Sequence, residues 1–117
     1  MNKLDKYGYE VLNVGTIETL SKENIFKILR QHKEKLKNHH VKRIGLFGSF
    51  LTGNNTGGSD IDLIVEFDAK KKNYNNFIEL AFLLEDLFQR KVDLLTIEAL
   101  NPYMKPKILK EAYFESI

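Results

Sequence analysis

Apolar residues recur along the chain at two different spacings, and each spacing predicts one kind of element. Helical spacing, with apolar residues three or four positions apart, begins after Ser21, a residue type that caps helices, and returns at Phe77. Short runs rich in β-branched residues predict strands instead. The pattern therefore predicts helices from Ser21 to Asn38, over 77–88, and after either Asn101-Pro102 or Lys105-Pro106, and strands over Val41–Phe47, Ile61–Phe67 and Val92–Thr96.

A glycine-rich segment separates the first two predicted strands. Residues 53–59 hold three of the seven glycines and no large apolar residue, so they are predicted to form a loop. The order helix, strand, loop, strand, helix, strand, helix predicts an α/β (α+β) fold, a small mixed sheet with helices packed mainly on one face. Residues 1–20 have poor periodicity, and both a short strand from Tyr9 to Val14 and a tail remain open.

Length and composition limit the classes of function. A chain of 117 residues suffices for one compact domain and is too short for two ordinary ones. The net charge of +2 is too small to indicate nucleic acid, and the Lys70-Lys71-Lys72 run is typical of a solvated loop, so we expect no direct nucleic-acid binding. The absence of cysteine excludes disulfides, thiolate metal sites and a cysteine nucleophile. Neither a bilayer-spanning run nor a signal-peptide core is found, so we expect a cytoplasmic protein without membrane contact.

Two aspartates lie at the start of the second predicted strand. Asp60 and Asp62 are two positions apart, so on a strand both project from one face while Ile61 and Leu63 project from the other. A solvated turn is the alternative, because two such charges in water repel by less than ~1 kcal/mol. Asp93 favours a site, since aspartate inside a strand is disfavoured and costly to desolvate. If the third strand pairs beside the second, three carboxylates converge as an oxygen-ligand set suited to Mg²⁺.

The pair Gly48-Ser49 directly follows the first predicted strand. There, backbone N–H groups and the serine hydroxyl can face phosphate oxygens, and glycine permits their close approach. Alone, such a pair is a common turn. The combination is more specific: Gly48-Ser49, ten intervening residues, Asp60-x-Asp62, and Asp93 on a strand about thirty positions later.

This combination resembles the signature of the polymerase-β-like nucleotidyltransferases, Gly-Ser-x10-Asp-x-Asp with a later strand aspartate. Phe47-Gly48-Ser49-Phe50 and Ser59-Asp60-Ile61-Asp62-Leu63 are similar to the minimal form of that family, and the resemblance runs from about Val41 to Tyr113. It implies a polymerase-β-like nucleotidyltransferase fold with a single minimal nucleotidyltransferase domain over residues 1–117. Residues 1–40 would be an N-terminal extension and helix, and residues 41–113 the catalytic core.

The resemblance also implies an activity: transfer of a nucleoside monophosphate from ATP, or a related triphosphate, to a hydroxyl group. The catalytic residues would be three carboxylates holding two Mg²⁺ ions, Asp60, Asp62 and Asp93. The nucleotide-binding residues would be Gly48, Ser49 and Ser59. No protein nucleophile is required, because positioning and charge neutralisation supply the rate.

One departure from the family pattern concerns a missing cation. Many relatives have Ala-Arg-Gly after Gly-Ser-Phe, whereas this chain has Leu51-Thr52-Gly53. If that arginine contacts phosphate or substrate, activity is weakened here or another basic residue substitutes for it. The candidates are Lys42, Arg43 and Lys70.

Minimal nucleotidyltransferases of this kind resemble the MntA-type antitoxins of HEPN/MNT toxin–antitoxin systems. In that family the enzyme adenylylates a tyrosine of a helical HEPN-domain toxin, a ribonuclease. The resemblance implies ATP as substrate and a HEPN toxin as partner, because a chain of 117 residues has no room for an acceptor domain. Two alternatives stay open: an antitoxin that acts by occlusion without catalysis, and a small-molecule nucleotidyltransferase that forms a homodimer with a groove built from residues 1–40.

Overall fold

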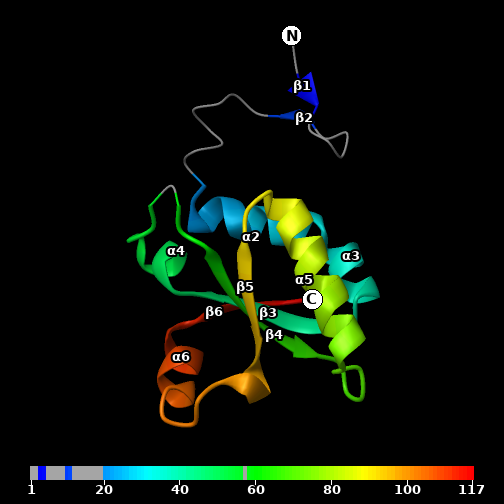
Figure 1. Ribbon diagram of the computed structural model, residues 1–117, viewed down its shortest axis with the longest axis vertical. Coiled ribbons are helices and arrows are strands. Elements are labelled where there is room, and N and C mark those ends of the chain that lie inside the picture. Colours follow the sequence, from blue (N-terminus) through cyan, green and yellow to red (C-terminus); the bar gives the residue numbers. More distant parts are fainter. Residues whose placement is uncertain (1–2, 5–9, 12–19, 57) are drawn as a thin grey trace.

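The structure, a computed structural model, describes residues 3–4, 10–11, 20–56 and 58–117. Most of this part of the chain forms one sheet with helices packed on it (Figure 1). Two short strands, β1 (Lys3–Leu4) and β2 (Glu10–Val11), pair with each other antiparallel. Of the segment from Tyr9 to Val14, only Glu10–Val11 lies within the described residues, and it is extended.

The main sheet has four strands in the order β5-β4-β3-β6. Strands β3 (Val41–Phe47), β4 (Ile61–Phe67) and β5 (Val92–Thr96) have the bounds that the sequence predicts. Strand β6 (Tyr113–Ser116) was not predicted, and it pairs antiparallel with β3 at the far edge. Strands β3 and β4 are antiparallel whereas β4 and β5 are parallel, so the sheet is mixed, as expected.

Three helices pack on one face of this sheet. The predicted first helix is divided at His32 into α2 (Lys22–Gln31) and α3 (Lys33–Asn38), and the Ser21 hydroxyl caps α2 by accepting a hydrogen bond from the Asn24 N–H at 3.3 Å. Helix α5 (Tyr74–Phe88) connects β4 to β5, as a parallel pair of strands requires. The prediction that helices lie mainly on one face is therefore confirmed.

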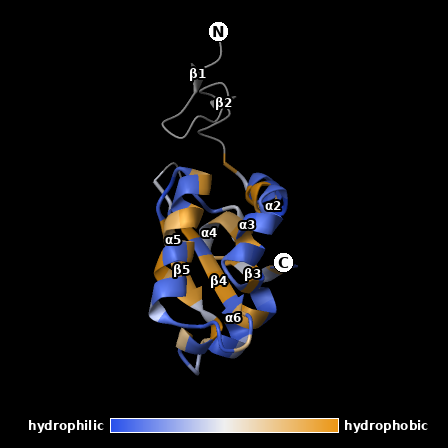
Figure 2. Cartoon of the chain, turned by 90° about the vertical axis from the view of Figure 1, so that its right-hand side faces the viewer, coloured by the Kyte–Doolittle hydropathy of each residue, from blue (hydrophilic) through white to orange (hydrophobic). Residues whose placement is uncertain are grey.

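The main core lies between that sheet face and the three helices. Because side chains alternate along a strand, the buried residues of β4 on this face are every second one, namely Ile61, Leu63, Val65 and Phe67. Figure 2 shows β4 coloured largely hydrophobic, whereas the outer surfaces of α2 and α3 are hydrophilic. The residues of α2, α3 and α5 that are buried in this core are Ile25, Phe26, Leu29, Leu36, Leu80, Leu84 and Phe88.

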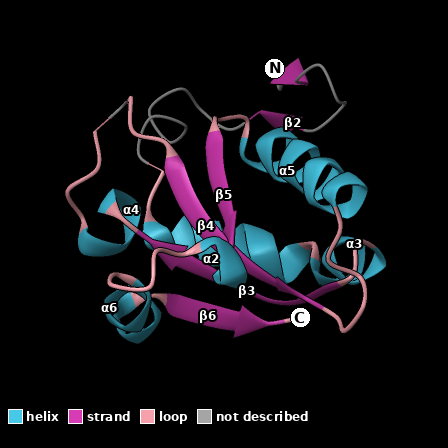
Figure 3. Cartoon of the chain, turned by 60° about the horizontal axis from the view of Figure 1, so that its bottom comes forward, coloured by secondary structure: helices cyan, strands magenta, loops and turns pink. Residues whose placement is uncertain are grey.

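The opposite sheet face is covered over only part of its length. The 3₁₀ turn η1 (Ile97–Ala99) and helix α6 (Lys105–Glu111), which lies beside β6 in Figure 3, form a second small core around Ile64. Of the two starts that the sequence allows for the last helix, the one at Lys105-Pro106 is the correct one. The remainder of this face is where the side chains of the two strand aspartates project. In the part of the chain that the structure describes, no helix has the length and apolar character needed to cross a bilayer.

Candidate active site

Asp62 and Asp93 lie side by side on neighbouring strands. The parallel register of β4 and β5 places their Cα atoms as partners. Asp93 is exposed while its neighbours Val92 and Leu94 are buried, so its side chain projects away from the main core. The strand pairing on which the convergence of the three acids depends is therefore present.

Asp60 precedes the first residue of β4 and is held by the segment before β5. The Ile61 N–H donates a hydrogen bond to the Lys91 carbonyl at 3.1 Å, which continues the strand pairing toward this end. Lys91 Nζ lies 3.7 Å from Asp60 Oδ2. Their side chains are 72% and 39% exposed, so solvent screens this ion pair and we expect it to contribute no more than about 1 kcal/mol.

Gly48 brings the turn after β3 directly against Asp62. Residue Phe47 is the register partner of Asp62, and the next residue, Gly48, has φ +75°, which favours glycine. A Cβ at position 48 would lie 2.2 Å from Asp62 Oδ2. The glycine of the Gly-Ser turn is therefore in contact with one of the two strand acids, Asp62.

The residues after Gly48 form a short helix, α4 (Ser49–Thr52), where the sequence predicts only a turn. Its first hydrogen bonds run from the Leu51 and Thr52 N–H groups to the Gly48 carbonyl, at 3.1 and 3.2 Å. The N–H groups of Ser49 and Phe50 come before Leu51, at the N-terminus of this helical turn. N–H groups at the N-terminus of a helical turn are suited to bind phosphate oxygens.

The electrostatics of the acids agree with this geometry. Burial raises the pKa of Asp62 above its ordinary value, and the negative charges of Asp93 and then Asp60 raise it further. Asp93 and Asp60 thus each repel the ionised carboxylate of Asp62. A bound cation would remove that repulsion and favour the ionised carboxylates.

The donor chemistry of the three acids fits a divalent ion. Carboxylate oxygens are the ligands that Mg²⁺ prefers, and the strand register places two of these acids, Asp62 and Asp93, side by side. Across residues 20–56 and 58–117, however, no three acidic or histidine side chains stand close enough to hold an ion as they are. Binding would therefore have to draw Asp60, Asp62 and Asp93 together.

Ser59, predicted to bind nucleotide, is used inside the glycine loop in this structure. Its hydroxyl accepts a hydrogen bond from the Thr56 N–H at 2.8 Å and lies 3.3 Å from the Thr56 hydroxyl. The Thr56–Ser59 hydrogen bond therefore closes the loop immediately before Asp60. Ser59 directly precedes Asp60 in the chain, and its contact with nucleotide remains a prediction.

Arg90 also contacts residues next to the Gly-Ser turn and the acids, which the sequence pattern did not predict. Its Nη1 donates a hydrogen bond to the Ser59 carbonyl at 3.1 Å, and its guanidinium carbon lies 5.4 Å from the centre of the Phe50 ring. Arg43, one of the three candidates to replace the missing cation, is instead paired with Glu66 at 2.7 Å and stacked on Phe114 at 4.3 Å. The sequence indicates only that Arg90 is a basic residue just before the strand that carries Asp93, and this does not predict its contacts.

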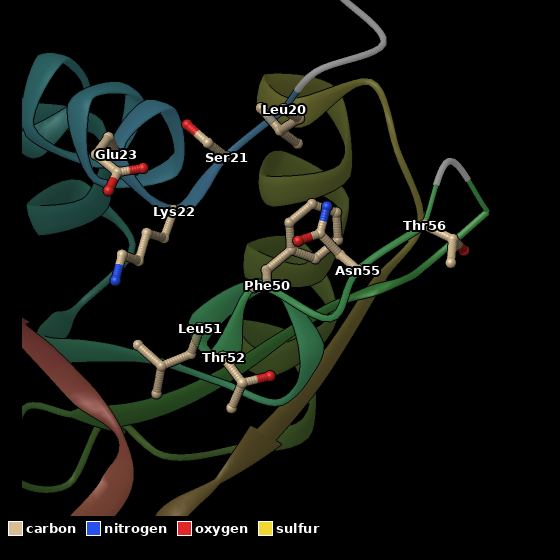
Figure 4. Close-up of a pocket in the computed structure, with 10 residues that line it drawn as sticks. Leu20, Ser21, Lys22, Glu23, Phe50, Leu51, Thr52, Asn55 and Thr56 are labelled. Atoms are coloured by element: carbon tan, nitrogen blue, oxygen red, sulfur yellow. The ribbon is translucent and has the colours of Figure 1, made fainter.

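A hollow of about 420 Å³ lies beside α4, between it and the start of α2 (Figure 4). Phe50, Leu51 and Thr52 form one side, and Lys22 and its neighbours at the start of α2 form the other. None of the three aspartates lines it. The hollow therefore adjoins the Gly-Ser turn without including the acids.

Comparison of the sequence with known proteins identifies relatives over most of its length. The sequence profile of the nucleotidyltransferase domain family matches residues 25–114. A protein of Methanocaldococcus jannaschii, provisionally named a protein adenylyltransferase, is 42% identical over 101 residues, which are 84% of this chain and 99% of that protein. The protein adenylyltransferase MntA of Thermococcus cleftensis is 34% identical over 96 residues, 81% of this chain and 96% of that protein.

Solved structures agree with the sequence matches. One provisionally described as a minimal nucleotidyltransferase superposes with a TM-score of 0.70 at 25% identity, covering 81% of this chain and 96% of that one. A toxin–antitoxin structure with AMP-PNP gives a TM-score of 0.57 at 25% identity and covers 81% of this chain and 72% of that one. The α/β architecture described above is thus that of minimal nucleotidyltransferases.

Proposed function

The chain belongs to the nucleotidyltransferase domain family, and on that premise we propose that it transfers the adenylyl group of ATP to a hydroxyl group of a protein. The observation that carries the proposal is the contact of the Gly-Ser turn with the strand acids: Gly48 lies against Asp62, and Asp62 is in register with Asp93. Relatives named protein adenylyltransferases, one provisionally, support a protein as the acceptor.

In the proposed reaction the acceptor hydroxyl releases its proton to solvent and its oxygen attacks the α-phosphorus of ATP. The bond from that phosphorus to the oxygen that bridges it to the β-phosphorus breaks, and pyrophosphate leaves. Asp60, Asp62 and Asp93 would hold two Mg²⁺ ions. Bound Mg²⁺ supplies charge neutralisation and lowers the pKa of the acceptor hydroxyl. The turn that begins at Gly48 and Ser49 would bind the outer phosphates by charge-assisted hydrogen bonds. Its fixed N–H groups need no reorganisation when charge develops, which favours the transition state.

The proposed acceptor is a tyrosine of a toxin of the HEPN class, and the proposed compartment is the cytoplasm. A solved neighbour of this chain is a toxin–antitoxin structure with AMP-PNP, which supports both a toxin partner and ATP as the nucleotide. Asp93 is exposed, so a second protein can reach this part of the sheet from outside. In this proposal the acceptor surface belongs to the partner.

The test is transfer of label from α-labelled ATP to the co-expressed toxin in the presence of Mg²⁺. The toxin should be labelled by the unchanged protein and not by the Asp60→Asn or Asp62→Asn variants, each of which removes a charged oxygen ligand. Asp68→Asn is the matched control, because Asp68 is an exposed aspartate just beyond the other end of β4. Equal labelling by the Asp60→Asn variant would end the proposal.

A second candidate function is neutralisation of the toxin by occlusion alone. It is favoured by one observation, that no three acidic side chains within the described ranges stand as a ready ligand group. Under this alternative the Asp62→Asn variant still protects cells from the toxin, and the toxin from those cells carries no added AMP by mass spectrometry. Loss of protection in that variant, with the complex still formed, would favour the enzyme.

A further inference from the structure

We infer that Arg90 is a positioning residue that holds the Asp60 end of the glycine loop against the turn that follows β3. The inference rests on the proposed function, since it concerns the same site. In this role Arg90 contacts neither ATP nor the acceptor. Asp60 lies outside the β4 strand, so contacts other than strand pairing have to keep it beside Asp62 and Asp93, which strand pairing already fixes.

Three consecutive residues, from the last residue of the glycine loop to the first residue of β4, each contact the Arg90-Lys91 dipeptide. The Ser59 carbonyl accepts from Arg90 Nη1 at 3.1 Å, the Asp60 carboxylate faces Lys91 Nζ at 3.7 Å, and the Ile61 N–H donates to the Lys91 carbonyl at 3.1 Å. The lysine contact is exposed and weak. The arginine contact is partly buried, so it is the side-chain tether that we expect to matter.

Arg90 also reaches the other half of the site. Its guanidinium lies 5.4 Å from the centre of the Phe50 ring, and Phe50 is only 2% exposed, so that ring is a fixed platform. Phe50 lies two residues after Gly48, the residue that touches Asp62. The Arg90 side chain thus contacts both the segment that precedes Asp60 and the turn that contacts Asp62.

The guanidinium group suits this bridge for a chemical reason. Its planar, delocalised cation can stack on an aromatic ring while an N–H in its plane donates to a carbonyl. Lysine retains the charge but has a compact ammonium that cannot do both with the same geometry. We therefore expect Arg90→Lys to restore only part of what Arg90→Gln loses.

The consequence for the site is specific to Asp60. The ladder between β4 and β5 keeps Asp62 and Asp93 in register without Arg90. Without the tether, the Ser59–Asp60 segment is held to the Arg90-Lys91 dipeptide only by the exposed Lys91 contact and by the Ile61 hydrogen bond, so the order of this segment and the affinity for Mg²⁺ should both fall. Residues that orient metal ligands in this way typically contribute 10- to 100-fold to metal affinity.

Two measurements test the inference on the full-length protein. Amide hydrogen exchange of the metal-free protein should be faster at Ile61 in Arg90→Gln than in the unchanged protein, while the amides of Ile64 and Leu94 keep their rates. Titration with Mg²⁺, at a fixed concentration of a non-hydrolysable ATP analogue, should require about tenfold more Mg²⁺ for half-saturation in Arg90→Gln. In Arg90→Lys both effects should be smaller.

The matched control is Arg30→Gln. Arg30 also stacks on an aromatic ring, Phe26 at 5.9 Å, and also pairs with an oxygen, on Glu115, but it lies on α2 outside the site. Unchanged exchange at Ile61 and unchanged Mg²⁺ affinity in Arg90→Gln would overturn the inference, as would an equal loss in Arg30→Gln. If Arg90→Gln does not fold, the same two measurements on Arg90→Lys decide. Failure of the unchanged protein to bind Mg²⁺ and nucleotide would instead count against the proposed function.

Discussion

The backbone of Gly48 lies directly against the carboxylate of Asp62, so closely that a Cβ added at position 48 would come within 2.2 Å of Asp62 Oδ2. This contact joins two parts of the sequence that are separated by the whole glycine loop. It explains why a glycine follows β3: the positive φ of +75° and the lack of room both exclude a side chain. Gly48 is therefore required here because it has no side chain, and not because it makes the backbone flexible.

Replacing Gly48 with alanine should remove activity. The added methyl group has to displace the Asp62 carboxylate, and displacement of a reacting group by about 1 Å can cost ~100-fold in rate. The strained backbone should also lower the free energy of unfolding by about 1–3 kcal/mol. Rate of transfer to the partner and urea unfolding measure the two effects separately.

Gly53→Ala is the control for that substitution. Gly53 also has a positive φ, +83°, but nothing lies within 4 Å of the Cβ that alanine would add. It should therefore lose about 1–2 kcal/mol of stability from the left-handed backbone alone and keep its activity. Equal loss of activity in both variants would show that the contact with Asp62 is not what matters.

Asp62→Asn should stabilise the protein near neutral pH. The pKa of Asp62 is raised in the folded state, chiefly by burial, so folding favours the protonated form and the ionised carboxylate costs stability above the ordinary pKa of aspartate. Asparagine has no charge to desolvate. The gain in the free energy of unfolding should be full above the raised pKa and should disappear as the pH falls through it toward the ordinary value.

Urea unfolding at about pH 7 and about pH 4 measures this difference. The Asp68→Asn variant, which changes an exposed aspartate, serves as the reference at each pH. A gain at about pH 7 that persists unchanged in acid would mean that the side chain's shape and not its charge is responsible.

Asp93→Asn should lower the pKa of Asp62. Burial is the larger cause of the raised value and stays, but the repulsion from Asp93 disappears with its charge. The shift should therefore be partial. The carboxyl carbon of Asp62, followed by NMR through a pH titration without metal, reports it directly, and a titration identical to that of the unchanged protein would place the two acids out of electrostatic contact.

Arg43→Met should leave transfer activity intact. The guanidinium of Arg43 is engaged by Glu66 at 2.7 Å and by the Phe114 ring at 4.3 Å, several residues along the sheet from Asp62. Its loss should cost about 1 kcal/mol of stability, because the ion pair is partly exposed. Rates of transfer at saturating ATP and Mg²⁺ measure the activity, and a large fall would restore Arg43 as the replacement for the missing family arginine.

The three strands that carry the site could be predicted from the sequence to the residue. Each is a run rich in apolar and β-branched residues, and β3 and β4 end at a turn former and a charge, Gly48 and Asp68, so local pattern and final structure agree. The register of the acids followed from the same pattern, since the alternation that buries Ile61 and Leu63 turns Asp62 to the other face.

What could not be predicted depends on contacts between distant parts of the chain. Strand β6 has four residues with no alternation, and its pairing with β3 includes Gly45, where a Cβ would lie 2.7 Å from the Phe114 ring. The break at His32 follows no proline or glycine. Arg90 has a role only because the fold brings Ser59 and Phe50 to it, and a lone basic residue gives no signal of such a position.

The parallel pairing of β4 and β5 also governs when a working site can exist during synthesis. Parallel strands need a crossover, here α5, so a nascent chain that ends before Val92 has two of the acids and no place for the third. Any ion held by both strands would clamp the two ends of that crossover and raise the temperature of unfolding by mass action. The enzyme should therefore unfold at a higher temperature with the ion bound than without it. The ion-bound form should also resist proteolysis better.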